Sequence, residues 1–268
     1  MTTRTHTLSF GNFELTVFDD GSFTLPAEYF ANVPASVSEG LAETLTIGAN
    51  LWYIRTGDRR ILVDTGSANA LKAVFAETGQ AWDDLNQKTP TDIVLTHMHA
   101  DHLGGFAEGT IFPDAKVHVA KAEWEFWTNE GLANSVPEDQ RPMIQMIQQV
   151  AASFADRVVL QDGATELAPG LALEPLPGHT PGHTGIRLSS GPDALLIVGD
   201  AVISETLQFA TPDISYALDG DAEQAITTRR DLLQACAQDG TTLAATHFAF
   251  PGIGKVAKDG DTFRFDVA

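Results

Sequence analysis

Four potential metal ligands occur within six positions, in the pattern H-x-H-x-D-H from His97 to His102. Side chains two positions apart lie on the same side of an extended segment, so His97 and His99 can hold one ion. Asp101 and His102 are neighbours, and a curl of the chain into a following helix would direct both toward a second ion. Imidazole nitrogen and carboxylate oxygen without thiolate suit zinc, manganese, iron or cobalt. Three of the chain's eight histidines fall here, which argues against an ordinary polar surface loop.

Three further candidate ligands lie at strand ends later in the chain. His183 lies in a Gly/Pro-rich turn before an apolar strand, Asp200 follows the apolar run 195–198, and His247 follows the run 243–246. A single histidine at a strand end is more often a structural, hydrogen-bonded group. Functional groups gather on loops above a rigid sheet, so the three residues together with the H-x-H-x-D-H segment favour a metal site.

The elements that must position these residues alternate between strands and helices. A period-two pattern predicts a strand over 13–18, and the hairpin signal Gly57-Asp58 predicts strands over 51–56 and 60–63. Further short strands are predicted over 92–96 and 116–120. Helical spacing predicts helices over 121–128, 138–152 and 222–237, and a helix after Gly66. Strands, a histidine-bearing loop and a helix follow one another in both halves, roughly 1–165 and 166–268. We therefore expect a single α/β domain over 1–268, with a layered sheet core.

The combined motifs resemble the metallo-β-lactamase-fold hydrolases. Five signature elements of that superfamily occur in order, namely Asp64 in Asp-Thr-Gly, the H-x-H-x-D-H segment, His183, Asp200 and His247. The resemblance implies a four-layer αββα sandwich with two metal ions at one edge.

The resemblance also implies a role for each residue. His97, His99 and His183 would bind the first ion, Asp101, His102 and His247 the second, and Asp200 would bridge them. Asp64 would support the ligands from behind. These seven ligands complete both ions, so His179 is interpreted as a loop residue that hydrogen-bonds the backbone near the site.

The stretch 246–254 resembles the end of the methyl parathion hydrolase-like group, which is allied to the N-acyl homoserine lactonases. Asp200 argues against the zinc β-lactamases, which often carry cysteine there. One departure is that lactonases often place a tyrosine shortly after the bridging aspartate, whereas residues 201–204 read Ala-Val-Ile-Ser. Relatives in this group often form homodimers, so the resemblance allows a homodimer here.

The expected activity is hydrolysis by two divalent ions, with zinc favoured, that share a bridging hydroxide. Asp101 would assist the leaving oxygen. A lactone or an aryl ester is the favoured substrate, with an organophosphate triester as the first alternative. A glutathione-type thioesterase, and a persulfide dioxygenase with one iron held by two histidines and one aspartate, are the remaining alternatives. Aromatic residues are interpreted as walls of an apolar substrate pocket, with Trp124, Trp127 and Phe209 as the main candidates.

Composition narrows the remaining function classes. With 16 Lys and Arg against 36 Asp and Glu, the net charge is −20, which argues against nucleic acid or an anionic membrane as a partner. We find neither a signal-peptide pattern nor a membrane-length apolar run, so we expect a soluble cytoplasmic protein. The single cysteine, Cys236, cannot form an internal disulfide, and its place on the apolar face of a helix predicts a buried side chain.

Overall fold

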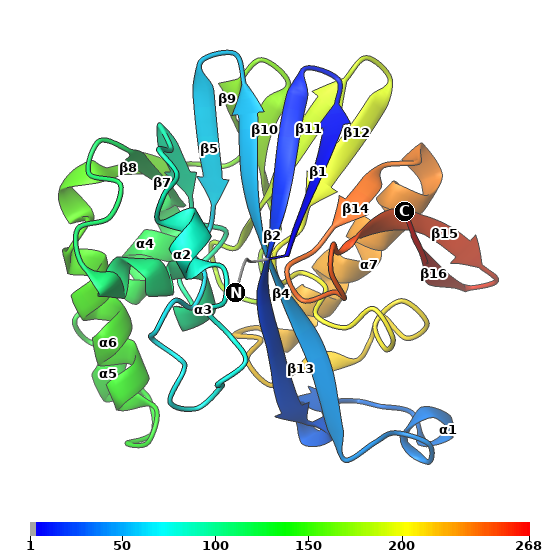
Figure 1. Cartoon of the computed structure of the whole chain (residues 1–268). Helices are drawn as coiled ribbons and strands as arrows, with labels where there is room; N and C mark the ends of the chain where they lie inside the picture. Colours follow the sequence, from blue (N-terminus) through cyan, green and yellow to red (C-terminus); the bar gives the residue numbers. More distant parts are fainter. Residues whose placement is uncertain (1–3) are drawn as a thin grey trace.

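The structure is a computed structural model that describes residues 4–268. Within this range the chain forms two seven-stranded sheets (Figure 1). The first sheet has the order β1-β2-β4-β5-β6-β7-β8, with strands β1 Thr5–Phe10, β2 Phe13–Pro26, β4 Thr44–Thr56, β5 Arg59–Val63, β6 Asp92–Val94, β7 Lys116–Ala120 and β8 Val158–Gln161. The second has the order β16-β15-β14-β12-β11-β10-β9, with strands β9 Thr165–Ala168, β10 Leu171–Pro175, β11 Thr184–Ser190, β12 Asp193–Ile197, β14 Thr242–Ala244, β15 Ile253–Asp259 and β16 Thr262–Val267.

Alternation along the strands builds the layers. In β4, Trp52 and Ile54 pack in the core between the two sheets, whereas Leu51 and Tyr53 pack in the core under the helices. Successive side chains of a strand point to opposite faces, so both faces of the first sheet bury apolar surface. Each sheet therefore needs a covering layer on its outer face.

Helices supply these outer layers. The first sheet is covered by α4 Lys121–Trp127, α5 Leu132–Ser135 and α6 Arg141–Ala152, and the second by α7 Ala222–Asp239. Helix α7 begins where the Asp221 side chain accepts a hydrogen bond from the Gln224 N–H, and it ends at Gly240 in the left-handed conformation. The predicted four-layer αββα sandwich is confirmed.

Shorter elements connect the layers. These are β3 Phe30–Ala31, which pairs with β13 Ser215–Tyr216, the helices α1 Ala35–Ser38, α2 Trp82–Leu85 and α3 Ala100–Leu103, and 3-10 turns at Ala27–Tyr29, Gly104–Glu108 and Ala155–Arg157. The helix predicted after Gly66 is wrong, because residues 68–74 form turns. The buried Asp20 carboxylate accepts hydrogen bonds from Ser67 N and Ala81 N, which fix the two ends of this loop in place of a helix.

The strands that precede the candidate ligands all end at one edge of the sandwich. β5 and β6 run parallel and end just before Asp64 and Thr96, while β12 and β14 run parallel and end just before Asp200 and His247. Figure 1 shows β2 and β4 continuing past this edge into an arm that carries α1. The edge thus faces loops from both sheets.

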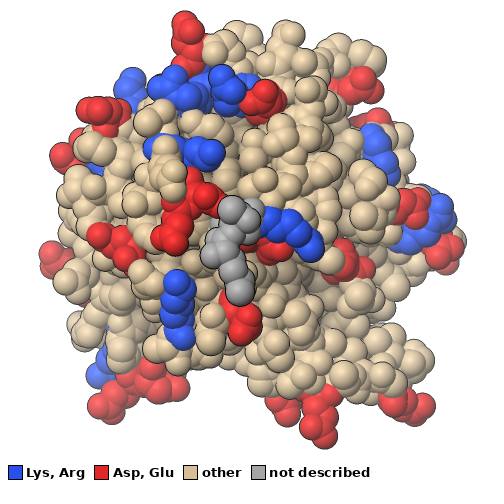
Figure 2. Space-filling model, in the orientation of Figure 1, with Lys and Arg blue, Asp and Glu red and all other residues tan. Residues whose placement is uncertain are grey.

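Charge is spread over the surface. On the face drawn in Figure 2, acidic side chains lie all around the rim, and basic side chains form small groups among them. No helix in residues 4–268 is long and apolar enough to cross a membrane.

Candidate metal centre

The H-x-H-x-D-H segment changes conformation half-way along. His97 lies in the loop just after β6, and His99, immediately before α3, has an extended backbone with φ −71° and ψ 159°. Asp101 and His102 then lie on the single turn of α3. The predicted curl therefore exists, and it separates the first two ligands from the second two.

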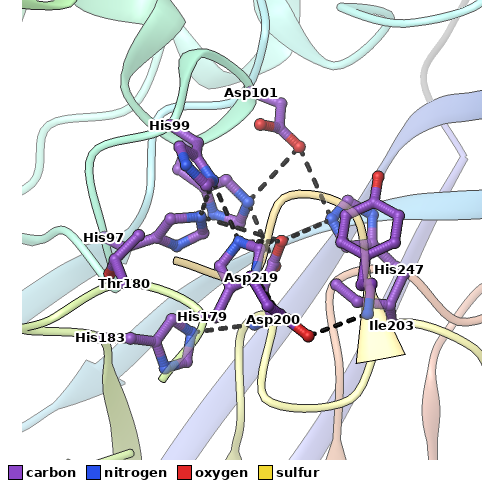
Figure 3. A network of polar contacts seen from close by, with 12 residues as sticks. His97, His99, Asp101, His179, Thr180, His183, Asp200, Ile203, Asp219 and His247 are labelled. Atoms are coloured by element: carbon purple, nitrogen blue, oxygen red, sulfur yellow. Dashed lines mark hydrogen bonds and ion pairs between the residues drawn. The ribbon is translucent and has the colours of Figure 1, made fainter. Parts of the chain in front are cut away.

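The first ligand cluster consists of three histidine nitrogens. His97 Nε2 and His179 Nε2 each lie 3.0 Å from His99 Nδ1, and Figure 3 shows the three rings converging. His97 comes from the first sheet and His179 from the loop before β11. A cation could be held by all three nitrogens at once.

The second ligand cluster consists of Asp101, His102 and His247. Asp101 Oδ2 lies 3.4 Å from His102 Nε2 and 3.6 Å from His247 Nε2. His247 Nδ1 donates to Gly48 O at 2.9 Å, which leaves Nε2 directed into the cluster. This cluster also draws on both sheets.

Asp200 lies between the two clusters (Figure 3). Its Oδ1 is 3.2 Å from His102 Nε2, and its Oδ2 is 3.0 Å from His247 Nε2 and 3.4 Å from His179 Nε2. One carboxylate oxygen thus touches both clusters, as a bridging ligand would.

The prediction that His183 is a metal ligand and His179 a supporting residue is wrong, because the structure gives the two histidines the opposite roles. His183 Nδ1 donates to Leu176 O at 3.0 Å, and His183 Nε2 accepts from Asp200 N at 3.0 Å. Both ring nitrogens are used by the chain, so neither has a lone pair for a metal ion. His179 instead joins His97 and His99. The Gly/Pro-rich turn directs the His179 side chain toward the ligand cluster, whereas His183 accepts a hydrogen bond from the backbone of Asp200.

The donor atoms and charges of the site fit bound cations. His102 Nε2 and Asp200 Oδ1 are buried and make no hydrogen bond within the described chain, which is costly unless another group completes them. Burial and the neighbouring His179 lower the pKa of His99 to about 3, so its imidazole is neutral at neutral pH and keeps a lone pair for a cation. Burial alone would lower the pKa of His102, but the surrounding carboxylates, led by Asp200, raise it well above its usual value. The site therefore carries an excess of negative charge that cations would balance.

Two buried carboxylates support the ligands from behind. Asp64 adopts a left-handed φ of 59°, and its Oδ2 lies 2.8 Å from His102 Nδ1 while Oδ1 accepts from Thr96 N. Asp219 does the same for His179, with Oδ1 2.9 Å from Nδ1. The sequence resemblance pointed to Asp64 but gave no sign of Asp219.

Glu123 is a further buried carboxylate that sequence reasoning missed. Its Oε1 accepts from Met98 N and Trp127 Nε1, and its Oε2 accepts from Thr180 Oγ1 and Gly182 N, all within 3.0 Å. One side chain thus joins the His97–His99 segment to the His179 loop. A single glutamate in a short amphipathic helix gives no local signal of this role.

Residues 46–247, about three quarters of the chain, match the Metallo-beta-lactamase superfamily. The chain belongs to this superfamily.

Individual relatives are similar along much of the chain. "Beta-lactamase-like protein 2 homolog" of Caenorhabditis elegans is 30% identical over 166 residues, which cover 59% of this chain and 45% of that protein. The chain spans about half the length of the curated relatives it matches. Hydrolase AbOPH of the beta lactamase superfamily is 26% identical with a TM-score of 0.89, covering 100% of this chain and 98% of that one. AidC, a dizinc quorum-quenching lactonase in complex with a product, has the same fold at 24% identity and TM-score 0.87, covering 99% and 98%.

Of the three aromatic residues that were predicted to line the substrate pocket of this metallo-β-lactamase superfamily member, one borders the metal centre and two lie in the core. Trp127 packs edge-on against His99, with ring centroids 5.4 Å apart, so it borders the metal centre. Trp124 packs toward Phe154 in the core under the helices. Phe209 is buried between Phe248 and Phe265 beside the second sheet. The assignments of Trp124 and Phe209 to the pocket are therefore wrong, because both fill the core.

Two other aromatic side chains border the ligands. Phe23 packs edge-on against His247 at 5.8 Å, and Tyr216 stacks on His179 at 6.2 Å. Both belong to an apolar cluster with Ile47 and Ile203, supplied by β2, β4, β13 and the loop after Asp200. The ligands therefore sit against an apolar wall.

A cavity of about 360 Å³ reaches His247 from the side of β2 and β4. Ile47 and Phe250 give it apolar surface, and Asp19 and Glu205 give it acidic groups. Its one arginine, Arg4, lies 3.4 Å from Asp19 Oδ2 and stacks over the Phe250 ring. The cavity has room for a small organic molecule.

Proposed function

We propose that the protein is a hydrolase that uses two divalent ions, with zinc as the preferred metal, to cleave a neutral ester. A lactone or an aryl ester is the proposed substrate class. The observation that carries the proposal is the pair of three-residue ligand clusters that share Asp200. The ligand set is His97, His99 and His179 for one ion, Asp101, His102 and His247 for the other, and Asp200 for both.

The second cluster favours two ions over one. A mononuclear iron site needs two histidines and one aspartate, and would leave Asp101 and His247 without a metal to bind. Here both residues turn toward His102, with Asp101 Oδ2 and His247 Nε2 3.6 Å apart. The convergence of a second complete donor set supports a binuclear centre over the persulfide dioxygenase alternative.

Ions bound here would supply water activation and polarisation of the scissile bond. The chain's own residues do the positioning: Asp200 spaces the clusters, and Trp127 and Phe23 exclude water from their flanks. The Asp101 side chain is 20% exposed, against 4% for Asp200 and 0% for His102. Asp101 is therefore the carboxylate best placed to meet the leaving oxygen and its proton.

Charge and surroundings support a neutral substrate. The net charge of −20 repels anions. Arg187, the basic residue nearest to His183 in sequence, pairs with Glu174 on the neighbouring strand, and Arg4 is engaged by Asp19. Neither offers a free clamp for a glutathione or antibiotic carboxylate, whereas Phe23, Tyr216 and Ile203 offer apolar contact. The fold shared with the lactonase AidC is consistent with a lactone.

The test combines metal analysis with a substrate panel. Purified protein should hold about two ions per chain, and chelation should abolish activity that zinc then restores. The panel comprises acyl homoserine lactones, simple lactones, aryl acetates, paraoxon-type triesters, a glutathione thioester and a β-lactam. Fewer than one ion per chain, with unchanged ester hydrolysis after chelation, would refute the metal mechanism. A kcat/KM for the thioester or β-lactam about 100-fold above every neutral ester, or about 2.7 kcal/mol, would refute the substrate class.

A further inference from the structure

Helix α7 reaches the first ligand cluster through a buried chain of three side chains. His179 Nδ1 donates to Asp219 Oδ1 at 2.9 Å, and Figure 3 shows Asp219 behind His179. Asp219 Oδ2 accepts from Tyr216 N at 2.9 Å and lies 3.7 Å from Arg229 Nη2. The side chains of Asp219 and Arg229 are both 0% exposed.

Arg229 is anchored from the other side by backbone oxygens. Its Nε donates to Ala201 O at 3.0 Å, and its Nη1 donates to Pro212 O and Ile214 O at 2.8 Å each. Its Nη2 makes no hydrogen bond within the described chain and faces Asp219. A buried guanidinium needs a counter-charge, so Arg229 faces Asp219 and fixes the loop that carries it.

The two carboxylate oxygens of Asp219 have different partners and therefore different roles. Oδ2 closes the turn from Tyr216 to Asp219, which is a structural task. Oδ1 is not needed for that turn and points at His179 instead. A carboxylate that accepts from Nδ1–H keeps the proton there and leaves the Nε2 lone pair for a metal ion. That Nε2 is the atom that lies 3.0 Å from His99 Nδ1.

We propose that Asp219 is a positioning residue that fixes the tautomer of His179, and that Arg229 holds Asp219 for this task. The inference rests on the proposed function only in taking the first cluster as a metal site. Asp64 stands in the same relation to His102, so each cluster has one histidine supported by a buried carboxylate. Asp219 and Arg229 add α7 and the loop before it to the metal centre.

The test is Asp219→Asn, which keeps the shape but removes the charge. If the amide oxygen keeps the Tyr216 N–H, the amide NH2 faces His179 Nδ1 and drives the proton onto Nε2. We expect the metal-free variant to switch the His179 tautomer in long-range ¹⁵N–¹H spectra. We expect metal affinity at one of two sites to fall by roughly 10–100-fold. The control is Asp221→Asn, which removes a nearby charge while its amide oxygen can still accept from Gln224 N at the start of α7, and which should keep the His179 tautomer and the metal affinity.

A second variant guards against a purely structural explanation. In Asp219→Asn combined with Arg229→Met, the unpaired buried charge is gone, so affinity should stay low if the tautomer is the cause. Recovery of wild-type affinity in this double variant would overturn the proposal, as would an unchanged tautomer and affinity in Asp219→Asn. Wild-type protein that binds no metal would refute the proposed function instead, while the tautomer experiment would still test the Asp219–His179 link.

Discussion

Replacing His179 and His183 separately by alanine should separate metal binding from folding. The two residues are four positions apart in one loop, and both are buried. Their ring nitrogens have different partners, however. His179 Nε2 faces the other ligand atoms, whereas both nitrogens of His183 are bonded to backbone.

The magnitudes follow from these partners. In His183→Ala, the Leu176 carbonyl and the Asp200 N–H both lose a buried partner, at about 1–3 kcal/mol each. The metal-free protein should therefore lose about 2–6 kcal/mol of unfolding free energy. In His179→Ala one of three donor nitrogens is gone. Even removing a group behind a ligand weakens metal binding by about 10–100-fold, so this variant should lose more than about 100-fold.

Two assays read the two effects independently. Denaturant unfolding of the chelated proteins measures stability, and competition with a chromophoric chelator measures metal affinity. If His183→Ala fails to fold, His183→Asn keeps a donor for the Leu176 carbonyl and should lose only about 1–3 kcal/mol. The reasoning is refuted if either His183 variant loses one ion per chain while His179→Ala retains two at wild-type affinity.

Four further predictions concern other parts of the molecule. Burial alone would raise the pKa of Asp92, but hydrogen bonds from His118, Thr91 and Arg59 hold it at about 2. Asp92→Asn should therefore lower the Tm at pH 7. The difference in Tm between the variant and the wild type should shrink as the pH falls from 4 to 2, because the carboxylate is then protonated. Burial raises the pKa of the Cys236 thiol to about 11, so a thiol reagent at pH 8 should react only after denaturant is added, and rapid reaction of native protein would contradict this. A Cβ at Gly182 would overlap the backbone nitrogen of Glu123, so Gly182→Ala should cost about 1–3 kcal/mol in thermal or denaturant unfolding, unlike Gly40→Ala, whose Cβ would meet no atom within 4 Å. The homodimer stays a prediction, and light scattering that gives a 28.7 kDa species at micromolar concentration would contradict it.

Sequence patterns correctly predicted the helices and strands that depend mainly on residues close in the chain. The strand Lys116–Ala120 is found with its predicted bounds, and the helix predicted over 222–237 from its helical spacing is α7. These features depend on residues close in sequence. The helical spacing after Gly66 failed because Asp20, more than 45 positions away, holds that segment as a loop.

The same distinction applies to the metal centre. The curl between His99 and Asp101 is a local event, so the spacing of the H-x-H-x-D-H segment was sufficient to predict it. The choice between His179 and His183 is not local. It is made by Asp219, 40 positions away from His179, and by the backbone of Asp200, 17 positions away from His183. Two histidines in one turn carry no sequence sign of which will turn inward.

The metal centre also explains why the ligands are divided between the two sheets. His97 to His102 follow a strand of the first sheet, while Asp200 and His247 follow strands of the second. Each cluster takes ligands from both sides, so neither sheet could hold an ion alone. Supports from behind come from both sides as well, with Asp64 after β5 and Asp219 just before α7. Ions bound to both clusters would therefore join the two halves of the sandwich, and their binding free energy would add to the stability of the folded chain.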